Sequence, residues 1–211
     1  MKIALDAMGG DHAPHVVVEG AVQAAQAWPE IEILLVGKQD VIEAELKKHK
    51  TDGLKLRVVH ADDVVEMHEH TMAVKEKKGA SMNVAARLVR QGEADGFTTA
   101  GNTAAGMAAA LFNIGRIKGI DRPALATVYP AAPTTCLLLD VGANTDLQPD
   151  NLLQFAIMGD VYVRSVLGIA NPRLGIISNG EEEDKGSMLT RDAQKLLKAH
   201  SALNYIGCVE G

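Results

Sequence analysis

Short aliphatic runs alternate with longer amphipathic segments along the whole chain, and this alternation constrains the fold more than any other feature. The short runs have the length and composition of strands: Lys2–Leu5, Ile31–Val36, Leu54–Val59, Gly96–Thr99, Leu125–Tyr129, Thr135–Asp140, Leu174–Ile177 and Tyr205–Ile206. The longer segments carry apolar residues at the three- and four-residue spacing of helices: His15–Ala27, Gln39–Lys48, Asn83–Gln91, Thr103–Ile114, Asp150–Leu167 and Arg191–Ala199. The alternation predicts an α/β fold with right-handed βαβ crossovers and a mostly parallel sheet covered by helices on both faces.

Residues that favour helix starts support several of these boundaries. Pro14 and Pro149 suit the first position of a helix, and Thr190 is suited to cap the helix that follows it. No internal repeat, linker or low-complexity tract interrupts the 211 residues. A chain of this length is long enough for one large core, so we expect residues 1–211 to form a single α/β domain.

The composition argues against several classes of function. The formal net charge of −6 disfavours a general nucleic-acid-binding protein, which needs clustered Lys and Arg side chains to neutralise phosphates. Cys136 and Cys208 form no C-x-x-C pair, so the sequence indicates neither a disulfide nor a zinc site and favours a reducing cytoplasm. No export signal follows Met1, and no apolar run reaches the roughly 18 residues of a transmembrane helix, so any membrane contact is expected to be peripheral.

Ligands of open parallel sheets bind at the carboxyl ends of the strands, which makes the loops there the candidate sites. After the first expected strand, Asp6 is followed by Gly9 and Gly10, which predict a tight turn before a helix. The backbone N–H groups of such a turn are able to hold an anion, although the same pattern also serves as an ordinary structural turn. The loop is neither a Walker A motif nor GxGxxG.

A second loop of small polar residues lies between a strand and a strongly apolar helix. It contains Gly101, Asn102 and Thr103. Asn102 or Thr103 is suited to cap the helix, and the N-terminus of the same helix is suited to receive phosphate oxygens. A simple cap and an anion site are both compatible with this pattern.

A third loop places Asp140, Gly142, Asn144 and Asp146 between an apolar strand and the helix that begins near Pro149. These polar side chains either orient a substrate or form a hydrogen-bond network at the edge of the sheet. Taken alone, the sequence favours the structural network slightly.

The fourth loop, GIISNGEEEDKGS, holds the four acids 181–184 before Lys185. An acidic run is typical of a solvated loop. A lone lysine among glycine-bounded acids at the end of a strand is less usual, because a phosphate or a developing oxyanion needs such a cation. His68 and His70 flank Glu69 elsewhere, but two histidines without a third ligand are weak grounds for a metal site.

The run KIALDAMGGDHAP closely resembles the opening signature of the PlsX phosphate acyltransferases. The resemblance continues in order through EILLVG, VVHADDVVEM, FTTAGNTAAG, GRIKGIDRPALAT, LLLDVGAN, LLQFAIMG, NGEEEDKG and NYIGCVEG, and so spans the entire chain. It implies a three-layer α/β/α sandwich similar to isopropylmalate dehydrogenases and phosphotransacetylases. Members of the family usually continue beyond the position of Gly211, so this chain is expected to be the N-terminal two-thirds of the family's full length.

The resemblance implies a reaction in which inorganic phosphate attacks the thioester of an acyl carrier protein, yielding acyl phosphate for phospholipid synthesis, with no cofactor and no metal. The catalytic residues it points to are Lys185, Asn144 and His12. The phosphate- and substrate-binding residues it points to are Asp6, Gly9, Gly10, Gly101, Asn102, Thr103 and Asn179. It also implies a homodimer, cytoplasmic with peripheral membrane association. The lysines at 75, 77 and 78 with Ser81 are typical of a solvated helix face, or alternatively dock the acidic carrier protein.

Two other functions fit parts of the sequence. A phosphotransacetylase that uses coenzyme A shares the phosphate and acyl chemistry on a related fold. An inactive fragment that only dimerises is the other alternative, since the chain ends at Gly211 without the family's further loops. A dehydrogenase is disfavoured, because no GxGxxG with a downstream ribose-binding acid is present.

Overall fold

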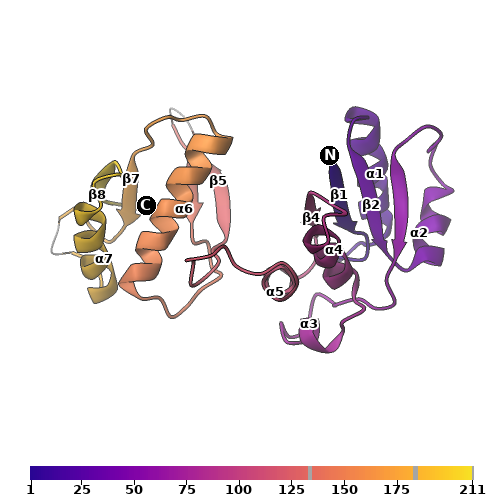
Figure 1. Ribbon diagram of the computed structural model, residues 1–211, viewed down its shortest axis with the longest axis horizontal. Helices are drawn as coiled ribbons and strands as arrows, with labels where there is room; N and C mark the ends of the chain where they lie inside the picture. Colours follow the sequence, from indigo (N-terminus) through magenta and orange to yellow (C-terminus); the bar gives the residue numbers. More distant parts are fainter. Residues whose placement is uncertain (133–134, 183–184, 211) are drawn as a thin grey trace. The chain divides into compact units, whose positions relative to one another are not determined.

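The computed structural model describes residues 1–132, 135–182 and 185–210 and divides into two compact units, Met1–Gly115 (unit 1) and Arg116–Gly211 (unit 2) (Figure 1). The single domain expected for residues 1–211 stays a prediction. Among the described residues, no helix is both long and apolar enough to cross a membrane.

Unit 1 is built around a parallel sheet. Its elements are β1 (Lys2–Asp6), α1 (His15–Ala27), β2 (Glu32–Gly37), α2 (Gln39–Leu46), β3 (Leu56–His60), α3 (Ala73–Glu76), α4 (Ser81–Arg90), β4 (Gly96–Thr98) and α5 (Thr103–Asn113). The strands follow the order β3-β2-β1-β4, and all three pairings are parallel. The alternation of strands and helices in the sequence is thus confirmed here.

Alternate residues of β2 show how helices cover both faces of this sheet. Ile33 and Leu35 pack into a buried cluster with residues of α1 and α2, whereas Leu34 and Val36 pack into a second cluster with Ala85 and other residues of α4. A strand that is buried on both faces reads as a continuous apolar run, as EILLVG does. Unit 1 therefore has three layers, with α1 and α2 on one face and α4 on the other.

A further cluster joins α3, α4 and α5 through small side chains. Ala105, Ala108 and Ala109 of α5 are buried in the same cluster as Ala86 of α4, so the two helices pack closely. Asn83 is buried among them, and its amide donates to the carbonyl of Val74 at 2.8 Å. The sequence pattern missed α3, because one turn is too short to show helical periodicity.

Unit 2 pairs its strands differently. Its elements are β5 (Ala126–Pro130), β6 (Thr135–Leu139), α6 (Pro149–Val166), β7 (Leu174–Ile177), α7 (Met188–Ala199) and β8 (Tyr205–Val209). The pair β7–β8 is parallel, and β5–β6 is the one antiparallel pairing among the described strands. The short connection between β5 and β6 permits a hairpin, whereas a parallel pair needs a long crossover. The sheets of the chain are therefore mostly parallel, as expected.

The helix starts confirm one sequence prediction and correct two. Pro149 is the first residue of α6, as predicted. Pro14 lies one position earlier than predicted, because α1 begins at His15. Thr190 does not cap α7, because Ser187 takes that position and its hydroxyl accepts a hydrogen bond from the Thr190 N–H at 3.1 Å.

Candidate functional site

Strands β1 and β4 are neighbours in the parallel sheet, so the loops that follow them leave from the same edge. Asp6 at the end of β1 is 1% exposed, and its Oδ2 accepts a hydrogen bond from the Thr99 hydroxyl at 2.7 Å. Its Oδ1 accepts from the N–H of Met8 at 3.2 Å. The Thr99 oxygen accepts in turn from the N–H of Gly101 at 3.0 Å. Asp6 and Thr99 thus join the two loops.

Gly9 lies where these two loops meet. A β-carbon on Gly9 would lie 2.6 Å from Asp6 Oδ2, 2.7 Å from Thr99 Oγ1 and 2.9 Å from the backbone nitrogen of Gly101. Real β-carbons essentially never approach other atoms so closely, so a side chain would displace the second loop. Gly10 has a φ of 108°, which only glycine adopts readily. The glycine pair therefore brings the backbone of the first loop directly against the second.

Asn102 is the cap of α5, which decides between the two residues that the sequence offered for this role. Its Oδ1 accepts from the N–H of Ala105 at 3.0 Å, while its amide donates to the carbonyls of Met67 at 3.0 Å and Glu69 at 3.3 Å. The side chain is therefore engaged by the protein itself. Thr103 begins α5, and its N–H and that of the next residue find no acceptor among the described residues. Such first-turn donors favour an anion.

In unit 2, the loop after β6 is held by the Asp140 carboxylate. It accepts hydrogen bonds from the N–H groups of Leu125 at 2.8 Å, Ala143 at 3.2 Å and Asn144 at 2.9 Å. The Asn144 amide donates to the same carboxylate at 3.1 Å and to the carbonyl of Pro123 at 2.9 Å. Burial raises the pKa of Asp140, but these hydrogen bonds together outweigh it and hold the pKa below its usual range. The hydrogen-bond network considered for this loop is thus confirmed.

The loop between β7 and α7 folds back on itself around Gly180. Gly180 is buried, and a β-carbon there would lie 2.7 Å from Glu182 Oε2 and 2.9 Å from Lys185 Cγ. The N–H of Lys185 donates to the carbonyl of Glu182 at 3.1 Å. The side chains of Lys185 and Asn179 are exposed. The lysine is therefore presented to solvent in the loop between β7 and α7.

An acidic hollow adjoins this loop. It measures about 420 Å³ and is lined by Glu181, Glu182 and Glu210. Carboxylates repel an anion, so the hollow itself does not suit phosphate. The predicted acids Glu183 and Asp184 lie outside the described residues.

Comparisons with known proteins identify the family of the chain. The profile of a family described as fatty acid synthesis protein matches residues 1–211. The chain belongs to this family. A phosphate acyltransferase from Geotalea daltonii is 52% identical over 212 residues, which cover 100% of this chain and 61% of that protein. A phosphate acyltransferase from Herpetosiphon aurantiacus is 50% identical over 211 residues, which cover 100% of this chain and 57% of that protein.

These relatives confirm the resemblance to the phosphate acyltransferase family, and they also show how much of it is present. The chain spans about three fifths of the length of the curated relatives that it matches, 61% and 57% for the two above.

Solved structures confirm the phosphotransacetylase-like α/β fold. A phosphotransacetylase from Streptococcus pyogenes matches with a TM-score of 0.68 at 18% identity, covering 100% of this chain and 68% of that one. The EutD phosphotransacetylase from Staphylococcus aureus matches with a TM-score of 0.65 at 17% identity, covering 100% and 67%. Identities this low show a shared fold and nothing more.

The site residues expected of a phosphate acyltransferase fall into two groups. Those that unit 1 brings together at one sheet edge are Asp6, Gly9, Gly10, Gly101, Asn102 and Thr103. Those that lie in unit 2 are Asn144, Asn179 and Lys185. An anion site shared by Lys185 and the glycine pair joins residues of both units and stays a prediction. His12 lies in the turn before α1 with an exposed side chain, for which the described residues offer no hydrogen-bond partner.

The lysine run is not one solvated face. Lys77 donates to Glu69 Oε2 at 2.8 Å and to a backbone carbonyl at 2.8 Å, and the hydrogen bond to Glu69 raises the pKa of Lys77. Ser81 is buried at the start of α4. The solvated-face prediction is therefore wrong for these two residues, because the loop before α3 folds over them. Lys75 and Lys78 are exposed.

Thr99 is the residue that sequence reasoning missed. Its role depends on the pairing of β1 with β4, in which Leu5 lies opposite Thr98, so that Asp6 meets the next residue. These partners lie 93 positions apart in the chain. The available signal was a hydroxyl residue directly after the strand that neighbours β1.

His68 and His70, the two histidines considered for a metal, are both exposed. The described part of the chain contains no group of three or more His, Cys, Asp or Glu side chains arranged to hold a metal ion. Glu69 between them bonds to Lys77.

Proposed function

We propose that this chain belongs to an enzyme that converts acyl-[acyl carrier protein] and inorganic phosphate into acyl phosphate and free carrier protein, feeding phosphatidic acid synthesis. The observation that supports this proposal most is the family match over residues 1–211. In this chain, the loops after β1 and β4 also approach closely at Gly9 and form a platform of backbone beside the N-terminus of α5. Such a platform suits an anion, because it offers backbone N–H groups and the positive end of a helix.

Phosphorolysis of a thioester requires little covalent chemistry from the protein. A phosphate oxygen attacks the carbonyl carbon, a tetrahedral oxyanion forms, and the carbon–sulfur bond then breaks to release the thiolate, which takes up a proton. Phosphate is itself a nucleophile near neutral pH, so the protein's contribution is to position two substrates and stabilise the oxyanion, effects worth several kcal/mol each.

In this mechanism, the first-turn N–H groups of α5 and the Gly9–Gly10 turn bind phosphate, and the exposed Lys185 ammonium supplies the cation. Asp6 is buried and fully engaged, so it acts as a positioning residue that holds Thr99 and the glycine turn in place. Asn102 is likewise a positioning residue, since it caps α5.

The residues Asn144, Asn179 and His12 have less direct roles in the proposal. Asn144 shapes its loop through Asp140, and the exposed Asn179 contributes a polar group next to the lysine loop. His12 in its protonated form would donate the proton to the departing thiolate. A thiol leaves readily without such help, so His12 contributes least.

The decisive experiment measures release of free carrier thiol and formation of acyl phosphate from palmitoyl carrier protein, with and without phosphate. The Geotalea daltonii phosphate acyltransferase serves as the positive control. Phosphate-dependent release supports the proposal, whereas release that is independent of phosphate contradicts it. Preferential turnover of acetyl coenzyme A would instead favour a phosphotransacetylase.

Lys185→Ala tests the assignment of the cation in the same assay. We expect the phosphate KM to rise and turnover to fall, because the anion loses a charge partner. Unchanged values for both would contradict the role of Lys185. We also propose, from the family resemblance alone, a cytoplasmic homodimer with peripheral membrane association, which sedimentation and vesicle-binding measurements would test.

A further inference from the structure

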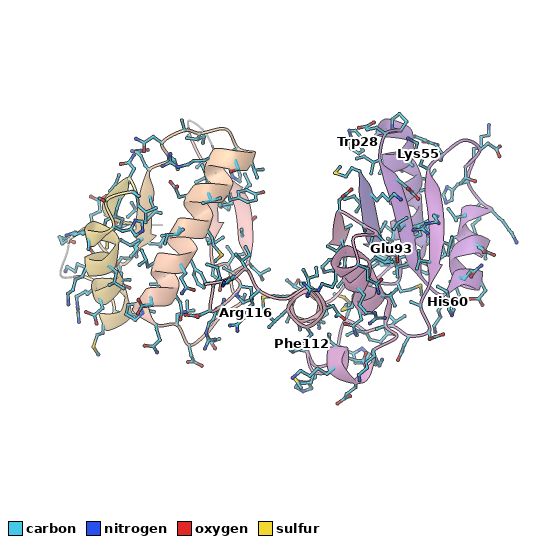
Figure 2. All side chains as sticks on the ribbon, in the orientation of Figure 1. Trp28, Lys55, His60, Glu93, Phe112 and Arg116 are labelled. Atoms are coloured by element: carbon cyan, nitrogen blue, oxygen red, sulfur yellow. The ribbon has the colours of Figure 1, made fainter. Side chains whose placement is uncertain are left out.

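A cationic groove lies on unit 1. It is a hollow of about 500 Å³ between α3, α4 and α5, which we call the α3–α5 groove. Its lining includes the side chains of Lys75, Lys78 and Arg87 and the apolar Val74 and Phe112. Figure 2 shows Phe112 on α5, and Lys75 Nζ lies 4.5 Å from the centre of its ring.

The cations of this groove lack the carboxylate partners that other lysines of the chain have. Lys77, in the same run, bonds to Glu69, whereas Lys75 and Lys78 form no ion pair among the described residues. Arg87 donates to the backbone carbonyl of Lys78 at 2.8 Å, which leaves its charge uncompensated by a carboxylate of the described chain. The groove lining contains no acidic residue within the described part of the molecule. An excess of positive charge in a chain of net charge −6 points to an acidic partner.

The apolar part of the groove narrows the choice of partner. Phe112 is 48% exposed, so the groove presents an apolar ring beside its cations. Two amide side chains that line the groove bond to each other, since the Asn113 amide donates to Asn83 Oδ1 at 2.8 Å. The complementary surface therefore carries carboxylates around an apolar side chain, as an acidic amphipathic helix does.

We propose that the α3–α5 groove docks an acidic helical surface of the carrier protein that delivers the acyl thioester. This inference rests on the proposed function for the identity of the carrier, but not for the charge and shape of the groove. A nucleic acid fits less well, because its phosphates need a longer cationic track than three side chains around an aromatic ring.

The test uses acyl carrier protein without its prosthetic arm, so that binding of the arm at the reaction site does not contribute. Its affinity for the chain is measured by fluorescence anisotropy at low and at physiological ionic strength. The double variant Lys75→Glu/Lys78→Glu is expected to weaken binding about tenfold or more, and to flatten the salt dependence. Phe112→Ser is expected to weaken binding with the salt dependence retained.

Lys47→Glu/Lys50→Glu is the matched control, because it makes the same change in net charge at exposed lysines near the end of α2. Helix α2 packs on the opposite face of the sheet from α4. This control is expected to change affinity less than about twofold. Circular dichroism confirms that each variant is folded.

Failure of the groove and failure of the proposed function give different results. Phosphate-dependent turnover whose carrier kcat/KM is unaffected by Lys75→Glu/Lys78→Glu overturns the groove and leaves the function standing. If this variant loses carrier binding while the wild type shows no phosphate-dependent turnover, the groove is supported and the proposed function is overturned. The groove proposal also falls if the wild-type chain does not bind the carrier, or if charge reversal changes only self-association or binding to an oligonucleotide.

Discussion

The two units of the chain hold their candidate loops by different means. In unit 1, β2 is buried at five of its six residues, and the loops beside it are fixed by close contact between glycine backbones. In unit 2, all five residues of β5 are exposed, and the adjoining loop is fixed by a hydrogen-bonded carboxylate, Asp140. The loops of unit 1 thus combine steric fit at Gly9 with a hydrogen bond to the buried Asp6, whereas the loop after β6 depends on the hydrogen bonds of the less buried Asp140.

In the proposed mechanism, binding an anion requires two kinds of group, and the two kinds differ in how precisely they must be placed. A platform of backbone N–H groups works only when the backbone is fixed before the anion arrives, which the Gly9 contact provides. A lysine needs less precise placement, since its charge acts over several ångströms and its stem is flexible. The exposed Lys185 is a group of this second kind.

The largest effect is expected from Gly9→Ala. Its new methyl group would lie under 3.0 Å from three atoms, one of them backbone, so the variant should lose about 3 kcal/mol of unfolding free energy. Urea unfolding measures this loss. The control is Gly20→Ala in α1, where a β-carbon meets no described atom within 4 Å. There we expect a gain of about 0.5–1 kcal/mol, because alanine favours a helix. Equal changes in unfolding free energy at both sites would show that close contacts at Gly9 do not hold the loops of unit 1.

Thr99→Val is expected to have the next largest effect. The change keeps the shape of the side chain but leaves buried Asp6 without the hydroxyl that donates to it, and the Gly101 N–H without its acceptor. The cost should be about 2 kcal/mol. Thr98→Val, at the exposed end of β4, is the control and should change stability by less than about 0.5 kcal/mol. A small loss at Thr99 would mean that the two loops are held by backbone contacts alone.

Part of the fold could be predicted from the sequence, and part could not. Helix α1 and strand β7 have the predicted bounds, because local periodicity and flanking residues set them. The four loops were found for the same reason, since each follows a strand. The bond between Asp6 and Thr99 was not found, because it depends on which strands pair across the chain.

Non-local contacts explain the other differences as well. The ion pair of Lys77 with Glu69 depends on how the loop before α3 folds, and the β5–β6 hairpin depends on a pairing that two aliphatic runs do not specify. Roles at the candidate site were harder still to predict. Asn102 was suited to a cap or to an anion, and only the direction of its hydrogen bonds shows that it caps α5.

Asp140→Asn tests the polar side of the comparison. Because the pKa of Asp140 is lowered in the folded chain, its ionised form stabilises the fold above the unfolded pKa of about 4, and this contribution is lost as the pH falls through the lower folded value. We expect the variant to be about 1 kcal/mol less stable at neutral pH, with the difference shrinking on the acid side. Asp146→Asn, at an exposed residue of the same loop, is the control. A difference that is constant with pH would contradict this account.

Lys185→Ala should have the smallest effect on stability. It therefore tests whether the lysine contributes charge and not support for its loop. The side chain is exposed and has no ion-pair partner among the described residues, so its loss should change the unfolding free energy by less than about 0.5 kcal/mol. If unit 2 contributes only charge, added phosphate should raise the melting temperature of the wild type more than that of the variant, because a ligand that binds only the folded state stabilises it more when it binds more tightly. Lys195→Ala, which removes an equal charge from α7, should leave the phosphate response intact. A large loss of stability at Lys185 without phosphate would show instead that the lysine, like Asp140, holds its loop in place, and its assignment as the anion's cation would then have to be given up.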